Sequence, residues 1–113
     1  MSDNAGHVSH SQVSVIGRMG ARMVERELPS GDAVTTFTVV VDRPASARRE
    51  GGASVDAIPC QVFKATLARR LTGIEAGEWV NVSGTLRRRF WKGPAGLGSA
   101  LEVEVSTLTR VRP

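Results

Sequence analysis

The residues with the clearest chemical potential lie in one short stretch, GTLRRRFWKG, from Gly84 to Gly93. Period-two alternation along a strand sorts this stretch into two faces. One face carries Arg87, Arg89 and Trp91, two guanidinium groups and an indole ring at successive same-side positions. Guanidinium groups pair with phosphates through a planar fork of donors, and an exposed indole offers a platform for stacking a base. The stretch is therefore a candidate binding surface for a partner that carries phosphates and rings.

A second strand-like run, which follows the glycine-rich segment Gly93–Ser99, can account for part of this charge. Closing a hairpin through a loop at Gly93–Ser99 places Arg87 opposite Glu104 and Arg89 opposite Glu102. Such cross-strand ion pairs on a solvated face contribute about 0.2–1 kcal/mol each. A purely structural interpretation of the arginines therefore stays open at this stage.

Three residues of the same hairpin are not explained by ion pairing. Trp91 and Lys92 stand near its tip, and Arg88 falls on the face that is otherwise apolar. Because a buried, unpaired charge is costly, Arg88 indicates that the hairpin extends past the core with water on both sides. An extended basic hairpin with an aromatic tip suits binding along a nucleic-acid strand.

The charge of the chain is unevenly distributed. The 113 residues carry a net charge of +4, with 15 Lys and Arg against 11 Asp and Glu. Residues 1–56 hold six basic and seven acidic side chains, whereas residues 57–113 hold nine and four. The basic second half favours an anionic partner, although ordinary surface charge can give the same count.

Length and composition narrow the class of protein. A chain of this length forms one domain with one core. It has neither an apolar stretch of membrane-spanning length nor a secretory signal pattern, so we expect no membrane contact. The single cysteine, Cys60, excludes an internal disulfide and fits a reducing compartment. We therefore expect a soluble, cytoplasmic protein.

No constellation of residues suggests catalysis. His7 and His10 form an HxxH pair without an accompanying cluster of other ligands, so we expect no metal site. Cys60 alternates with Ile58 and Val62, which is typical of a buried small apolar residue, and no base lies near it in sequence. We expect neither enzymatic activity nor a cofactor.

Turn-forming clusters divide the chain into five strands and one helix. Only one run has helical spacing, with Leu67 and Leu71 at i and i+4. Gly17 and Gly20 mark positions where the first strand can bend or bulge. Three strands, a short helix and two strands predict an all-β, five-stranded OB-fold barrel with an extended hairpin between the fourth and fifth strands. The predicted strands are 13–28, 33–42, 55–63, 79–91 and 100–111; the helix is 64–72, residues 1–11 are a flexible tail, and residues 12–113 form the barrel domain.

In this order, the segments resemble the bacterial single-stranded DNA-binding proteins. The resemblance covers about residues 12–112 and keeps the spacing of that family. Its pieces are VIGRMG at 15–20, LPSGDAV at 28–34, FTV at 37–39, CQVF at 60–63, AGEWVNVSGTLR at 76–87, Trp91, and EVEV at 102–105.

The resemblance implies an OB fold that assembles as a homotetramer and wraps single-stranded DNA without sequence preference, in replication, recombination or repair. It also implies base stacking on outward aromatic side chains at two positions of this chain. Together with the basic residues of the first strand and the hairpin, these rings make up the expected DNA site. Its residues are Arg18, Phe63, Arg87, Arg89, Trp91 and Lys92.

The chain departs from the family pattern at several positions. Ala45 and Ala57 stand where relatives carry aromatic residues, and Pro59 stands where they carry a basic one. The sequence ends at RVRP without an acidic tip, so we expect no recruitment of proteins through an acidic tail. These departures keep a second hypothesis open, namely an OB-fold interaction module with weakened nucleic-acid binding that acts through protein partners. RNA is also compatible with stacking and phosphate contacts.

Overall fold

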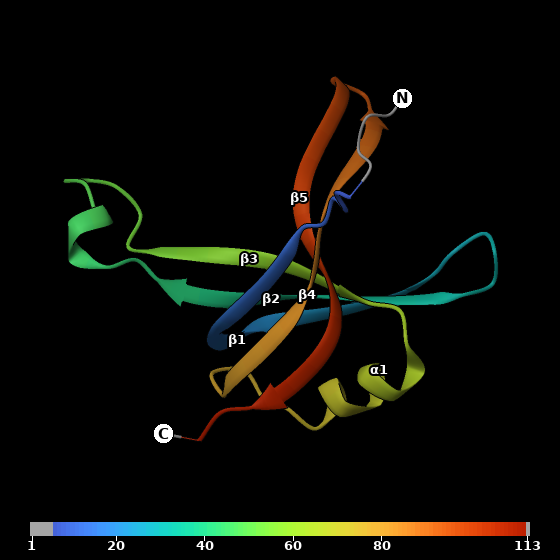
Figure 1. The fold of residues 1–113 in the computed structure, drawn as a ribbon, viewed down its shortest axis with the longest axis horizontal. Helices are drawn as coiled ribbons and strands as arrows, with labels where there is room; N and C mark the ends of the chain where they lie inside the picture. Colours follow the sequence, from blue (N-terminus) through green and yellow to red (C-terminus); the bar gives the residue numbers. More distant parts are fainter. Residues whose placement is uncertain (1–5, 113) are drawn as a thin grey trace.

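The computed structural model describes residues 6–112, and in this part of the chain five strands close into a barrel. Around the barrel the strands follow the order β1-β2-β3-β5-β4, with β3 and β5 parallel and the other described pairs antiparallel. The predicted OB-fold barrel is confirmed, including its helix between the third and fourth strands (Figure 1). The elements are β1 (Gln12–Glu27), β2 (Ala33–Asp42), the 3-10 turn η1 (Ala45–Ala47), β3 (Val55–Val62), α1 (Ala65–Thr72), β4 (Trp79–Gly93) and β5 (Gly96–Arg110).

Alternation along the strands places one row of side chains inside the barrel. Val80 and Val82 of β4 are fully buried, while Asn81 between them is half-buried on the outer face. Leu67 and Leu71 of α1 join the same core, because their helical spacing turns both toward the barrel. The helix therefore covers one end of the barrel, and the β4–β5 hairpin rises from the opposite end (Figure 1).

β1 bends where its glycines predicted. Its register against β2 shifts between Met19, which pairs with Val39, and Met23, which pairs with Phe37. β1 therefore has two more residues than β2 in this interval. A side chain at Gly20 would collide with the hydroxyl and carbonyl groups of Thr38. Glycine therefore permits the close approach of the two backbones at the bulge.

The hairpin turn corrects the predicted register of β4 and β5. The expected loop at Gly93–Ser99 is wrong, because β5 already begins at Gly96, which pairs with Gly93 across a two-residue turn. Gly96 has a φ of +113°, a backbone conformation that favours glycine and allows this tight connection. Arg87 consequently lies opposite Glu102 rather than Glu104, a displacement of two residues that keeps every side chain on its predicted face.

The N-terminal segment joins the barrel just before β1. The first five residues of the predicted 1–11 tail lie outside the described residues, and residues 6–10 carry neither helix nor strand. The amide of Leu86 donates a hydrogen bond to the Ser11 carbonyl at 2.9 Å, and the Ser11 hydroxyl donates to the Leu86 carbonyl at 2.8 Å. Within residues 6–112, no helix has the length and apolar character needed to cross a membrane.

Candidate nucleic-acid interface

A groove of about 430 Å³ crosses the outer face of β1, β2 and β3 and reaches the base of the β4–β5 hairpin. Three of its lining side chains are arginines, Arg22 and Arg26 from β1 and Arg89 from β4. Outer-face residues of the two neighbouring strands line it between them, with Thr38 of β2 paired to Pro59 of β3. The groove thus has three arginines and one carboxylate, that of Glu102, and its other lining residues are uncharged.

The arginines of β1 reach the groove because they alternate along the strand. Arg22, Val24 and Arg26 occupy every second position beyond the bulge and share one face, and Val24 lies opposite Thr36. The five ion pairs of residues 6–112 leave both arginines without a partner carboxylate. Their charge is therefore available to a ligand in the groove.

Neither Arg22 nor Arg26 was among the residues that the sequence nominated. The charge balance of residues 1–56 is close to zero, and that sum conceals how the charges are sorted. In the run RMVERE, the arginines occupy even positions and the glutamates odd ones, so a strand sends them to opposite faces. Counting charge by strand face rather than by segment would have revealed both arginines.

A nearly buried carboxylate anchors the third arginine. Glu102 is 7% exposed, and its Oε1 accepts a hydrogen bond from Gln61 Nε2 at 2.6 Å and one from Arg89 Nε at 2.8 Å. The Cζ atom of Arg89 in turn lies 5.1 Å from the centre of the Trp91 ring, within cation–π range. Glu102 therefore orients the Arg89 guanidinium, which in turn covers one face of the Trp91 ring.

The Trp91 ring rests on the partner strand at Gly98. The two residues lie directly opposite each other, and a Cβ at Gly98 would come within 2.6 Å of Trp91 Cζ2. Glycine at this position leaves the space that the indole occupies. The ring is still 42% exposed, so it offers a fixed aromatic surface beside the groove.

The remaining predicted cations differ in how far their charge is compensated. Arg87 Nε lies 3.1 Å from Glu104 Oε1, and Arg18 Nη2 lies 2.7 Å from Asp42 Oδ1. The ion pairs expected on the hairpin therefore form, diagonally across the strands rather than between directly opposed residues. A phosphate must compete with these carboxylates, whereas Lys92 near the hairpin turn is exposed and outside the described ion pairs.

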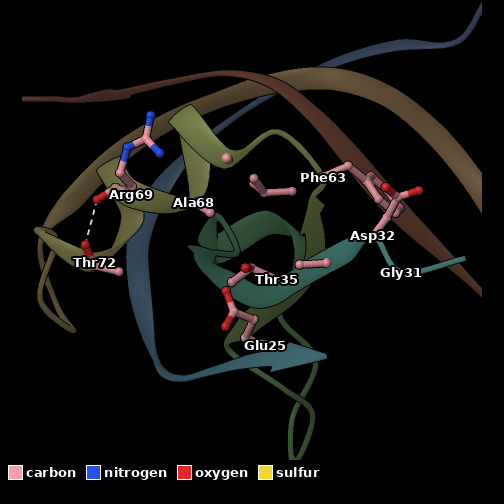
Figure 2. A pocket seen from close by; sticks show the side chains of 11 residues that line it. Glu25, Gly31, Asp32, Thr35, Phe63, Ala68, Arg69 and Thr72 are labelled. Atoms are coloured by element: carbon pink, nitrogen blue, oxygen red, sulfur yellow. Dashed lines mark hydrogen bonds between the residues drawn. The ribbon is translucent and has the colours of Figure 1, made fainter. Parts of the chain in front are cut away.

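Phe63 lies apart from the groove. It follows β3, is 45% exposed and lines a separate hollow beside α1 (Figure 2). The structure thus brings Arg87, Arg89, Trp91 and Lys92 together on one hairpin and places Phe63 and Arg18 elsewhere. Arg87, Arg89 and Trp91 share one face of the hairpin, Lys92 lies on its other face, and Phe63 and Arg18 are isolated positions.

No metal site accompanies the groove in the described residues. Within residues 6–112, no group of three or more His, Cys, Asp and Glu side chains could hold a metal ion. Cys60, which backs the groove, is 1% exposed, as its alternation with apolar neighbours predicted. Burial raises the pKa of its thiol to about 12, and the negative charge of Glu102 acts in the same direction.

A closed five-stranded barrel with a basic groove across the outer faces of its second and third strands defines an OB fold with a surface suited to polyanions. The chain belongs to the single-strand binding protein family, whose sequence model matches residues 10–111.

Curated relatives agree with this assignment. A single-stranded DNA-binding protein of Thermotoga maritima is 32% identical over 87 residues, covering 76% of this chain and 62% of the relative. The protein of that name from Bacillus cereus is 30% identical over 86 residues, covering 76% and 50%. The chain thus spans about half to three fifths of the length of these relatives.

Solved structures show the same fold. The Plasmodium falciparum SSB, in a complex with single-stranded DNA, superposes with a TM-score of 0.77 at 22% identity, covering 94% of this chain and 98% of that one. The mitochondrial single-stranded DNA-binding protein Rim1 of S. cerevisiae gives a TM-score of 0.72 at 16% identity, covering 93% and 98%. At these identities the likeness concerns the fold alone.

The buried thiol gives a prediction for the groove's floor. With a pKa near 12, Cys60 is almost entirely protonated at pH 8, and thiols react as thiolates. We expect Ellman's reagent to label native protein at pH 8 at least about 100-fold more slowly than protein in 8 M urea. Rapid labelling of the folded protein would show that the floor of the groove is open, contrary to this description.

Proposed function

We propose that this protein binds single-stranded DNA with little sequence preference, along the groove and the β4–β5 hairpin. The barrel domain of residues 12–113 performs this binding, in the cytoplasm at the nucleoid, during replication, recombination or repair. The protein acts by binding and carries out no catalysis. The observation that carries the proposal is the position of Arg89, which lines the groove with Arg22 and Arg26 and lies over the exposed ring of Trp91.

The groove and the hairpin have complementary roles in this proposal. Arg22 and Arg26 attract the phosphates, because no carboxylate of the described residues neutralises them. Trp91 stacks a base, a contact worth about 1–3 kcal/mol with little dependence on sequence. Arg89 lies between the two sites and can contact both the backbone and the ring.

The other predicted contacts complete the path. Arg87 and Lys92 extend the basic surface along the hairpin, and Arg18 joins it where a phosphate displaces Asp42. Phe63, which lines the separate α1 hollow, lies away from this path, so its predicted stacking role is not part of this proposal. The names of the relatives and of the structural neighbours, which refer to single-stranded DNA, support the proposal.

The alternative of an interaction module with weakened nucleic-acid binding finds less support. Its motivation was the absence of aromatic or basic side chains at Ala45, Ala57 and Pro59. Arg22 and Arg26 provide cations that this hypothesis did not consider, and they lie on the face that includes Pro59. If the folded protein failed to bind DNA at low salt, the interaction-module hypothesis would be favoured instead.

We also propose that the protein forms a homo-oligomer, a tetramer by resemblance to its family. On the outer face shared by β1 and β4, Ile16 lies opposite Asn81 and Ser14 opposite Ser83, a run without charge. Ile16 is 51% exposed, and Trp79, further along the same face, is 42% exposed and lies opposite Arg18, whose charge is paired with Asp42. A face with large exposed apolar side chains and few charges is suited to contact between copies.

The first test is a titration of the protein with dT oligomers at several salt concentrations, followed by tryptophan fluorescence. Each phosphate neutralised contributes about −0.7 to the slope of log K against log salt for a single strand. We expect Arg26→Ala to make the slope shallower by about 0.7, because it removes one uncompensated cation of the groove. Arg69→Ala, which removes an arginine that lines the α1 hollow instead, is the matched control and should leave the slope unchanged.

Equal effects of the two substitutions would mean that the groove has no special part in binding. Absence of any fluorescence change at low salt, in protein shown to be folded, would contradict DNA binding itself.

Removal of the anchored ring should affect affinity in a different way. We expect Trp91→Ala to weaken dT binding by about 1–3 kcal/mol without changing the salt slope, because stacking releases no counterions. Trp79→Phe is the control, since Trp79 is equally exposed but lies on the β1–β4 face. The two variants also separate the fluorescence signals of the tryptophans. An unchanged affinity for Trp91→Ala would exclude the stacking role.

The oligomer can be tested by light scattering after gel filtration. We expect the unmodified protein to have a multiple of the single-chain mass, and Ile16→Arg to lower that mass by placing an unpaired charge among the uncharged side chains around Ile16. Leu97→Arg, at an 83% exposed position on the hairpin, is the control for an added arginine. A single-chain mass for the unmodified protein would reject the oligomer.

A further inference from the structure

A second concave surface lies on the side of the molecule that carries α1. This α1 hollow has a volume of about 690 Å³, within the range of ligand sites, and lies between the helix, the β1–β2 loop and the ends of β1 and β3. Figure 2 shows Glu25 and Thr35 together at its centre, with Asp32 and Phe63 on one side and α1 on the other.

The α1 hollow has the opposite charge character to the groove. Glu25 and Asp32 line it, and neither takes part in the ion pairs of the described residues. The Ser30 hydroxyl donates a hydrogen bond to Asp32 Oδ2 at 3.1 Å. Because a hydroxyl is neutral, the negative charge of Asp32 stays uncompensated. Arg69 also lines the hollow, but its guanidinium group points away from both carboxylates (Figure 2).

The hydroxyl of a largely buried residue faces the same space. Thr35 is only 4% exposed and lines the hollow beside Glu25. Among residues 6–112 no hydrogen bond of its hydroxyl is found, yet the buried unpartnered side-chain atom there is Arg18 Nε, so the Thr35 hydroxyl opens onto the hollow. A hydroxyl that opens onto a hollow without a protein partner is free to donate to or accept from a polar ligand there.

The strand that separates the hollow from the groove explains why their charges differ. Glu25 lies between Val24 and Arg26 on β1, so its side chain emerges on the opposite face of the β1–β2 ribbon. A nucleic-acid backbone is attracted to the arginine face and repelled from the glutamate face. The ligand that complements the hollow is therefore a cation rather than a phosphate.

We propose that the α1 hollow binds a basic side chain, arginine or lysine, from a segment of a partner protein. Its charged head pairs with Glu25 and Asp32 and hydrogen-bonds the Thr35 hydroxyl, and its aliphatic stem packs against Ala68 and Phe63. Binding here does not depend on DNA in the groove, because the two surfaces lie on opposite faces of the ribbon. The protein thereby has a DNA face and a separate face for a basic protein segment.

The experiment uses N-acetyl-L-arginine amide as the probe and the full chain labelled with nitrogen-15. We expect saturable shifts of the backbone amides of Gly31, Asp32, Thr35, Phe63 and Ala68, which border the hollow. N-acetyl-L-citrulline amide has nearly the same shape without the charge, and we expect it to cause no saturable shift there. The spectra also show directly whether each variant is folded.

Matched variants test whether the carboxylates carry the binding. We expect Glu25→Gln to lower the affinity for N-acetyl-L-arginine amide roughly tenfold, which is the effect of losing one charge-assisted hydrogen bond. Glu27→Gln removes the same charge two residues further along β1, outside the hollow, and should leave the affinity unchanged. Both variants should keep the dT affinity of the unmodified protein within about twofold.

Three results would overturn the proposal. The first is an equal response to the citrulline and arginine derivatives, and the second is an equal effect of Glu25→Gln and Glu27→Gln. The third is a shift of the hollow's amides by a dC or dT oligomer but not by the arginine derivative, which would make the hollow a nucleobase site. Loss of dT binding alone, with the arginine response intact, would reject the DNA function and leave this proposal standing.

Discussion

The carboxylate of Glu102 sits where the barrel is least securely closed. β3 and β5 meet through only two backbone pairs, Cys60 with Val103 and Gln61 with Glu104, and theirs is the parallel pairing among the described strands. Glu102 adds a side-chain link at this seam, because it accepts from Gln61 on one strand and from Arg89 of the hairpin. Barrel closure, the floor of the groove and the orientation of Arg89 therefore depend on one nearly buried charge. The Glu102 carboxylate lies at the groove, close to water. Two hydrogen-bond donors therefore suffice to stabilise its charge.

The same arrangement gives side chains of the hairpin defined directions. Arg89 is held from below by Glu102, and Trp91 rests on Gly98 across the strand pair. Pre-organised side chains lose less conformational entropy when a ligand binds. The ion pairs that the hairpin shows are thus compatible with binding, since they set the direction of the groups that a ligand meets. A solvated, self-neutralised face and a binding face are not exclusive descriptions of these residues.

Much of the fold could be predicted from the sequence, because it depends on local periodicity. Period-two alternation located all five strands, and the leucine spacing located α1. The hairpin register could not be obtained in this way, because a shift of two residues preserves every face and only the turn at Gly96 decides between the alternatives. The groove was missed for a different reason. Arg22 and Arg26 become neighbours of Arg89 only when β1 and the hairpin flank the same outer face, which is a property of the closed barrel.

The bulge in β1 has a consequence for how this chain can change. It inserts two residues, an even number, and so the strand beyond it keeps the facing that it had before. A single-residue insertion or deletion near Gly20 would turn the side chains of β1 beyond it to the opposite face, while β2 kept its facing. Arg22 and Arg26 would then point toward α1, and Glu25 would enter the groove. The charges that β1 contributes to the groove and to the hollow would be exchanged without a single substitution, so the length of this segment constrains the chain as residue identity does.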